Sequence, residues 1–174
     1  MGLASRGLWK KGVTVASSED EKFMRLAIAK TREGIKQGQT PFGACIVKGG
    51  KVVACAHNAV WKTIDITAHA EVGAIRAACR KLGTIGLSGC TIYSTCEPCP
   101  MCFSAIHWAK IGKIVYGAGI ADAKECGFGE LEISNAAMKR LGKSNVKITK
   151  GVLRKECRAL FAEFADAGGR KRLY

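Results

Sequence analysis

Two short segments, about thirty residues apart, place the strongest constraint on how this chain folds. One is His69-Ala70-Glu71, and the other is Pro98-Cys99-Pro100-Met101-Cys102. Imidazole and thiolate groups are zinc ligands, and a zinc ion with three protein ligands keeps a fourth position open for water or substrate. The sequence therefore predicts that the fold brings His69, Cys99 and Cys102 together around one zinc ion per chain.

Glu71 lies two residues from the predicted ligand His69, so its carboxylate can face the same cavity without binding the metal. Zinc makes water available as a nucleophile near neutral pH. A neighbouring acid can take the proton from that water and hand it to a ring nitrogen and a leaving amine. Glu71 is therefore the predicted catalytic residue, in the role of a proton shuttle.

A Cys-x-x-Cys pair is also typical of redox sites and of structural zinc sites. Cys96 or Cys90 could supply a fourth thiolate and close the metal site. The His-x-Glu segment favours the open, catalytic site, because a structural zinc site has no use for the carboxylate of Glu71.

The length of 174 residues suits one domain with a proper core. We expect residues 1–17 to form a loose arm and residues 18–174 to form that domain. No apolar run approaches the ~20 residues of a membrane span, and the N-terminus does not fit a signal peptide. Nine cysteines are present, and those not used as ligands are predicted to be reduced core residues of a cytoplasmic protein, among them Cys45, Cys55, Cys79 and Cys90.

Predicted helices and strands alternate along the chain. Helical spacing and capping residues, including a capping box at Ser18 and Glu21, predict helices over residues 18–36, 68–81, 101–108, 121–126, 133–141 and 153–165. β-rich runs predict strands over residues 42–47, 52–56, 91–94, 113–117 and 146–150, the first two joined as a hairpin. Five strands separated mostly by helices predict an α/β fold, a three-layer α/β/α sandwich with a mixed sheet.

From about residue 19 onward, the chain resembles the cytidine deaminase-like superfamily, whose zinc-dependent base deaminases carry H-x-E and P-C-x-x-C. Within it, the chain is most similar to the guanine deaminase group, and plant-type guanosine deaminases share much of the pattern. Gly129-Glu130 stands where guanine deaminases usually carry Asp-Asp. The resemblance rests on Thr40-Pro-Phe-Gly-Ala44, Asn58, Thr67-Ala-His-Ala-Glu-Val72, Cys96-Glu-Pro-Cys-Pro-Met-Cys102, Ala105-Ile-His-Trp108 and Ala123-Lys-Glu-Cys-Gly-Phe128.

This resemblance implies hydrolytic deamination of a purine base or nucleoside, with guanine as first choice and guanosine as second. It implies six substrate-binding residues, namely Asn58, Phe42, Ala70, Trp108, Glu130 and Tyr174. An amide suits the mixed polar edge of a purine, Phe42 and Trp108 would sandwich the ring, and Glu130 would accept from guanine N–H groups. Tyr174 would cover the site. The structural alternatives are a turn residue for Asn58, a core residue for Trp108 and a solvated loop acid for Glu130.

The resemblance also implies a homodimer, with a domain swap through the C-terminal segment, and a small-molecule purine as partner. The charge complicates this picture, because the formal net charge is +14 and eleven Lys or Arg follow residue 138, against three acids. A basic surface is an electrostatic footprint for nucleic acid. The main alternative is therefore a tRNA adenosine deaminase, although a solvated basic face is favoured over RNA binding. A cytosine, cytidine or triazine deaminase is a further alternative.

Overall fold

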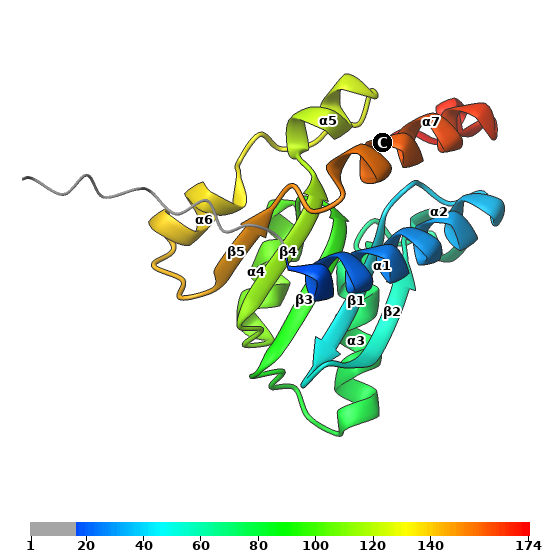
Figure 1. Ribbon diagram of the computed structural model, residues 1–174. Coiled ribbons are helices and arrows are strands. Elements are labelled where there is room, and N and C mark those ends of the chain that lie inside the picture. The colour runs from blue at the N-terminus through cyan, green and yellow to red at the C-terminus, as the bar shows by residue number, and fades with distance from the viewer. Residues whose placement is uncertain (1–16) are drawn as a thin grey trace, which may run out of the picture.

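The computed structural model describes residues 17–174, apart from the side chains of Arg170 and Arg172. At its centre lies a five-stranded sheet in the order β2-β1-β3-β4-β5 (Figure 1). The strands are β1 (Gly43–Lys48), β2 (Lys51–His57), β3 (Cys90–Cys96), β4 (Lys113–Ala118) and β5 (Lys147–Lys150). β1 is antiparallel to β2 and β3, whereas β3, β4 and β5 are mutually parallel. The predicted mixed sheet is confirmed.

Helices cover both faces of this sheet (Figure 1). Ile114 and Val115 are consecutive on β4, so their side chains point to opposite faces. Val115 belongs to a core cluster with residues of α1 (Ser18–Lys36) and α7 (Arg154–Asp166). Ile114 belongs to a second cluster with residues of α3 (Ala70–Leu82) and α4 (Pro100–Trp108). The three-layer α/β/α sandwich is therefore confirmed.

Shorter helices connect these layers: α2 (Val60–Thr63), α5 (Ile120–Glu125), α6 (Asn135–Leu141) and a 3₁₀ helix at Gly169–Arg172. Sequence periodicity does not predict α2 or the 3₁₀ helix, because four residues are too few to show a helical period. The capping residue of α1 is also one position earlier than predicted, since Ser17 Oγ accepts a hydrogen bond of 3.0 Å from the backbone N–H of Asp20.

A disulfide joins Cys45 on β1 to Cys55 on β2, so the prediction of reduced thiols is wrong for this pair. The hairpin register places these two residues directly opposite each other. Gly49 and Gly50 form the connecting turn with positive φ angles, which glycine adopts without a steric penalty. The disulfide depends on this register. The apolar pattern of each strand does not determine which cysteines lie opposite each other.

Among the helices of residues 17–174, none is long and apolar enough to span a membrane. The predicted N-terminal arm, apart from its last residue, lies outside the described residues. The division into an arm and one domain therefore stays a prediction.

Candidate functional site

The three predicted metal ligands lie where α3 and α4 begin. His69 is the N-cap of α3, Cys99 is the N-cap of α4, and Cys102 lies in the first turn of α4. The predicted helix began at residue 68, two positions earlier than α3 does, and therefore included His69 in its first turn. Neither N-cap side chain bonds to its own helix, so the imidazole and the thiol are free to face a shared ligand. Pro100 occupies the first helical position, where the missing N–H leaves no gap in the hydrogen bonding.

The distances among these side chains fit a tetrahedral zinc ion. His69 Nδ1 lies 3.7 Å from Cys99 Sγ and 3.6 Å from Cys102 Sγ. All three donor atoms lie within 4.8 Å of one another. Zinc bonds of about 2.0 Å to nitrogen and about 2.3 Å to sulfur at a tetrahedral angle require a separation of about 3.6 Å. The described residues therefore form a metal site of the predicted composition.

The pKa values of the two thiols are shifted in opposite directions, which favours the protonated form of Cys102. The pKa of Cys99 is lowered, first by the hydrogen bond that Cys102 donates to it and also by His69. The pKa of Cys102 is raised, first by that same bond and then by burial. Zinc binding needs both sulfurs as thiolates, so it must release the proton of Cys102, and metal affinity is expected to rise with pH.

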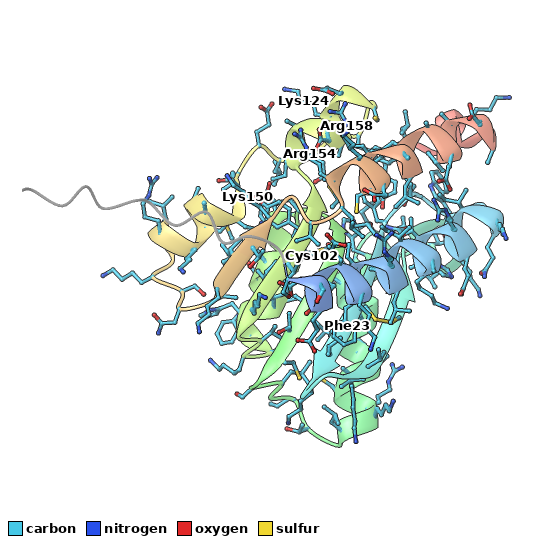
Figure 2. The ribbon with its side chains drawn as sticks, viewed as in Figure 1. Phe23, Cys102, Lys124, Lys150, Arg154 and Arg158 are labelled. Carbon is cyan, nitrogen blue, oxygen red and sulfur yellow. A yellow bond between two sulfur atoms is a disulfide. The ribbon has the colours of Figure 1, made fainter. Side chains whose placement is uncertain are left out.

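Glu71 is buried beside the predicted ligand Cys102, which is labelled in Figure 2. Its Oε1 accepts a hydrogen bond of 2.9 Å from Ser94 Oγ, and its Oε2 lies 3.4 Å from Cys102 Sγ. Burial raises the pKa of this carboxyl above its ordinary range. Glu71 is not part of the group of three metal-binding side chains, as a proton shuttle requires.

The two cysteines considered as a fourth ligand lie apart from this group. Cys96 is buried at the end of β3, with its Sγ 3.7 Å from the carbonyl oxygen of Gly119. Cys90 is buried at the start of the same strand, in the core beneath α3 and α4. Among residues 17–174, neither joins His69, Cys99 and Cys102. Three protein ligands would therefore hold the metal and leave a fourth position for water or substrate, as in catalytic sites.

A pocket of about 230 Å³ opens over the metal-binding group. Its wall combines His69 and Cys99 with Glu130, Tyr174 and a rim of apolar or small residues, namely Ile66, Pro100, Met101, Gly129 and Leu131. Glu130 is half-buried, and burial is the first cause that raises the pKa of its carboxyl to about 7. Ile66 and Leu131 were not predicted as site residues, although each lies close in sequence to one.

The C-terminal residue closes one side of this pocket. The Tyr174 hydroxyl accepts a hydrogen bond of 2.7 Å from Asn58 Nδ2, and its ring centroid lies 6.0 Å from that of His69. The Tyr174 carbonyl oxygen accepts a bond of 3.3 Å from the N–H of Gly129. Asn58 is fully buried, and its Oδ1 accepts from the N–H of Val60 at 3.0 Å. The fold thus unites Asn58, Tyr174 and Glu130 with the metal site, as predicted, while their roles stay predictions.

The predicted aromatic sandwich is not formed within this chain. Phe42 packs against Phe128 and Phe161, with ring centroids 4.9 and 5.9 Å away, and does not line the pocket. Trp108 is 75% exposed and lines a different hollow, beside Phe103. Helical geometry explains the position of Trp108. It is the last residue of α4, and a rise of about 1.5 Å per residue places it about 12 Å along the helix axis from Pro100, which follows Cys99.

Ala70, the last predicted substrate residue, is the first residue of α3 and is fully buried between the two predicted functional side chains His69 and Glu71. Ser94 was not predicted as a site residue. It lies near the end of β3, and only the packing of α3 on β3 brings its hydroxyl to Glu71.

Comparison with known proteins places this site in a family. Residues 17–118 match the model of the cytidine and deoxycytidylate deaminase zinc-binding region, which is more than half of the chain. The chain belongs to this deaminase family. The family binds zinc, and its members are hydrolytic enzymes that act on C–N bonds. The matched region contains His69, Glu71, Cys99 and Cys102, but it ends before Glu130 and Tyr174.

Relatives within the family differ in substrate. A guanine deaminase of Bacillus subtilis is 48% identical over 109 residues, which cover 62% of this chain and 70% of that protein. A tRNA-specific adenosine deaminase of the same organism is 35% identical over 147 residues, covering 84% of this chain and 89% of that deaminase. The solved structure of a guanine deaminase from Nitrosomonas europaea superposes with a TM-score of 0.79 at 29% identity, covering 87% of this chain and 86% of that one.

Proposed function

We propose that this deaminase acts on a free purine base or nucleoside, with guanine as its first substrate and guanosine as its second. Guanine and water would give xanthine and ammonia. The observation that carries this proposal is the wall of the pocket at the metal site, which combines one carboxylate, Glu130, with apolar residues.

The part of the pocket wall that the structure describes contains no Lys or Arg. Proteins that bind nucleotides in RNA make many of their contacts to phosphate, largely through Arg and Lys. Ile66 and Leu131, both exposed, instead form an apolar rim at the mouth. The volume of about 230 Å³ is below the ~300 Å³ at which pockets for drug-sized ligands begin. A single uncharged heterocycle, with or without ribose at the mouth, fits this wall better than a phosphate-linked nucleotide.

Glu130 supports guanine over adenine. Guanine presents a ring N–H and an exocyclic amine side by side, and a carboxylate accepts from both. Adenine offers an acceptor nitrogen at the corresponding edge, which would leave the carboxylate without a partner. An unpaired buried acceptor costs about 1–3 kcal/mol, so Glu130 is expected to select against adenine.

The residues of this chain supply binding and proton transfer. Zinc, when bound by His69, Cys99 and Cys102, supplies the Lewis acidity that makes water a nucleophile near neutral pH. Glu71 takes a proton from the attacking water and passes it to the ring nitrogen, and a second proton passes to the amine, which leaves as ammonia. Ser94 holds Glu71 Oε1 in place through its hydroxyl. Asn58 would bind the purine edge, and Tyr174 would exclude water from that side.

The rival function, editing of adenosine in tRNA, is favoured by the relative that aligns over 84% of this chain. The deciding experiment measures ammonia release from guanine, guanosine, adenine, adenosine, cytosine, cytidine, a triazine and a tRNA anticodon stem-loop. Turnover of guanine or guanosine well above the others would support the proposal. Turnover of the stem-loop, with free bases and nucleosides ignored, would replace it by the RNA-editing function. Sedimentation at several concentrations would test the expected homodimer.

A further inference from the structure

A second set of charged residues lies away from the metal site, between α6 and the start of α7, with the edge strand β5 between them. Residues 133–155 contain seven Lys or Arg and no Asp or Glu. Arg154 is paired with Asp122. The other six have no ion pair and no side-chain hydrogen bond among residues 17–174, and they are Lys139, Arg140, Lys143, Lys147, Lys150 and Lys155.

Three of these cations converge on one pocket of about 770 Å³. Lys139 and Arg140 line it from α6. Lys150, which is labelled in Figure 2, lines it from the end of β5. Tyr116 and Ile148 form part of its wall and are buried and half-buried respectively. The pocket thus has cations from two separate elements and apolar surface between them.

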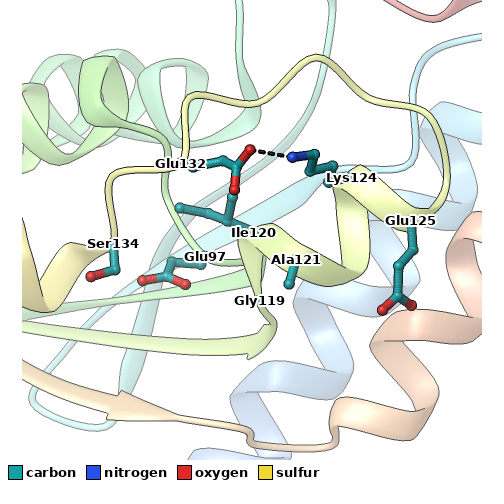
Figure 3. Close-up of a pocket in the computed structure, with 8 residues that line it drawn as sticks. All are labelled: Glu97, Gly119, Ile120, Ala121, Lys124, Glu125, Glu132 and Ser134. Carbon is teal, nitrogen blue, oxygen red and sulfur yellow. Dashed lines mark hydrogen bonds and ion pairs between the residues drawn. The ribbon is translucent and has the colours of Figure 1, made fainter.

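The one acid in this wall is engaged by neighbours. Glu97 is 9% exposed, and its Oε1 accepts a bond of 2.8 Å from the N–H of Asn135. Burial, and after it the charge of Glu97, raise the pKa of the Tyr116 hydroxyl, which lines the same wall. Figure 3 shows the neighbouring pocket, which shares Glu97 and Ser134 but differs in charge, because Lys124 there is paired with Glu132. Only the pocket between α6 and β5 combines a hollow with unpaired cations, among the pockets whose lining is described.

We propose that the pocket between α6 and β5 binds a nucleoside monophosphate through its phosphate group. Arg140 can donate two parallel hydrogen bonds to phosphate oxygens, and the two lysines add point charges. Two hydroxyl-bearing residues, Ser144 and Thr149, line the same wall. Tyr116 and Ile148 offer apolar surface to the nucleoside. A volume of about 770 Å³ lies within the ~300–1,000 Å³ of small-molecule sites.

This site is distinct from the deamination pocket, because the two walls have no residue in common. The proposal therefore does not depend on which purine is deaminated. An RNA backbone is the competing occupant. The concave shape favours the monophosphate, since an extended backbone needs a stripe of cations, whereas Lys139, Arg140 and Lys150 converge on one hollow.

The test is calorimetric titration of the zinc-loaded protein in phosphate-free buffer, with AMP, adenosine and a single-stranded RNA decamer as probes. We expect AMP to bind and adenosine to bind far more weakly. The double variant Arg140→Gln with Lys150→Gln should weaken AMP binding by about tenfold or more, as expected for loss of charge-assisted bonds. The matched control is Arg80→Gln with Lys81→Gln, which removes two exposed cations from α3 and should leave AMP affinity unchanged.

Amide chemical shifts of α6 and β5 would locate the bound AMP, and circular dichroism would verify that the variants fold. Equal affinity for adenosine and AMP would overturn the proposal, because the phosphate would then contribute nothing. Unchanged AMP affinity in the double variant, or binding of the RNA decamer alone, would overturn it as well.

Discussion

Residues 17–118 contain the metal-binding group and Glu71, whereas Glu130 and Tyr174, the polar groups on the other side of the pocket, come from the C-terminal third of the chain. In the first region, the N-termini of two helices hold the functional groups together. In the second region, long-range packing places the groups at the pocket. For example, Tyr174 is hydrogen-bonded to Asn58, which lies 116 residues earlier in the sequence.

This difference explains why relatives with unlike substrates resemble the same chain. A guanine deaminase and a tRNA-specific adenosine deaminase both align with it, and the family match ends at residue 118. The matched region carries the metal chemistry, which these reactions share. Under the function proposed above, selection of the substrate would depend on residues such as Glu130, which lie outside the match. Substitutions in the two regions should therefore have different effects.

The largest effect is expected from removal of a metal ligand. Cys102→Ala deletes one of three protein ligands, so zinc content should fall from about one ion per chain to near zero, and deamination should fall to background. Metal analysis of the purified protein measures this directly. Cys126→Ala is the matched control, because Cys126 is an exposed free thiol. Full zinc content in Cys102→Ala would contradict the proposed ligand set.

The next effect concerns proton transfer alone. Glu71→Gln keeps the size of the side chain and leaves His69, Cys99 and Cys102 in place, so zinc content and melting temperature should stay close to those of the wild type. The rate constant kcat should fall by roughly two to four powers of ten, the usual share of general acid–base catalysis. Steady-state kinetics paired with metal analysis separate the two quantities. Near-normal turnover would remove Glu71 from the mechanism.

A smaller effect, specific to one substrate, is expected in the C-terminal region. Glu130→Ala removes the acceptor for guanine N–H groups, so kcat/KM for guanine should fall by about 5- to 150-fold, which corresponds to about 1–3 kcal/mol. Zinc content should not change. Glu132→Ala is the control, because that acid is exposed and pairs with Lys124. An equal loss for guanine in both variants would mean that Glu130 does not select the substrate.

Tyr174→Phe tests the hydroxyl that bonds to Asn58. Loss of one neutral hydrogen bond is expected to change KM by about 2- to 12-fold, from about 0.5–1.5 kcal/mol, while kcat stays nearly constant. Tyr174→Ala also removes the ring beside His69 and should raise KM further. If both variants retained the wild-type KM, the C-terminal residue would have no part in substrate binding.

The same contrast describes what sequence could predict. His69, Glu71, Cys99 and Cys102 were found because their spacing and the flanking prolines are local patterns, and the strands were found from β-rich runs. The Cys45–Cys55 disulfide and the separation of Trp108 from the pocket were not found. Neither follows from a local sequence pattern. The disulfide depends on the register of the hairpin, and the position of Trp108 depends on the direction of the α4 axis relative to the pocket.

The smallest effect concerns the contact between the two regions. Arg32 on α1 donates three hydrogen bonds to Glu163 on α7, at 2.8 to 3.2 Å. Both side chains are partly exposed, 49% and 38%, and exposed pairs contribute only about 0.2–1 kcal/mol. Glu163→Gln should therefore lower the melting temperature at pH 7 by a few degrees at most, with catalysis unchanged.

The pKa of Glu163 determines how the effect of Glu163→Gln on stability changes with pH. The hydrogen bond from Arg32 is the first cause that lowers the pKa of Glu163 in the folded protein, relative to about 4.3 in an unfolded chain. The contribution to stability is therefore fully present above about pH 4.3 and is lost as the pH falls through the lower, folded-state pKa. Thermal unfolding at pH 7 and near pH 3 measures this effect. The difference in melting temperature between the wild type and Glu163→Gln should be smaller near pH 3. Glu156→Gln, on the same helix and without an ion pair among the described residues, is the control. A difference that stayed constant with pH would mean that packing of α7, rather than this ion pair, fastens the C-terminal region to α1.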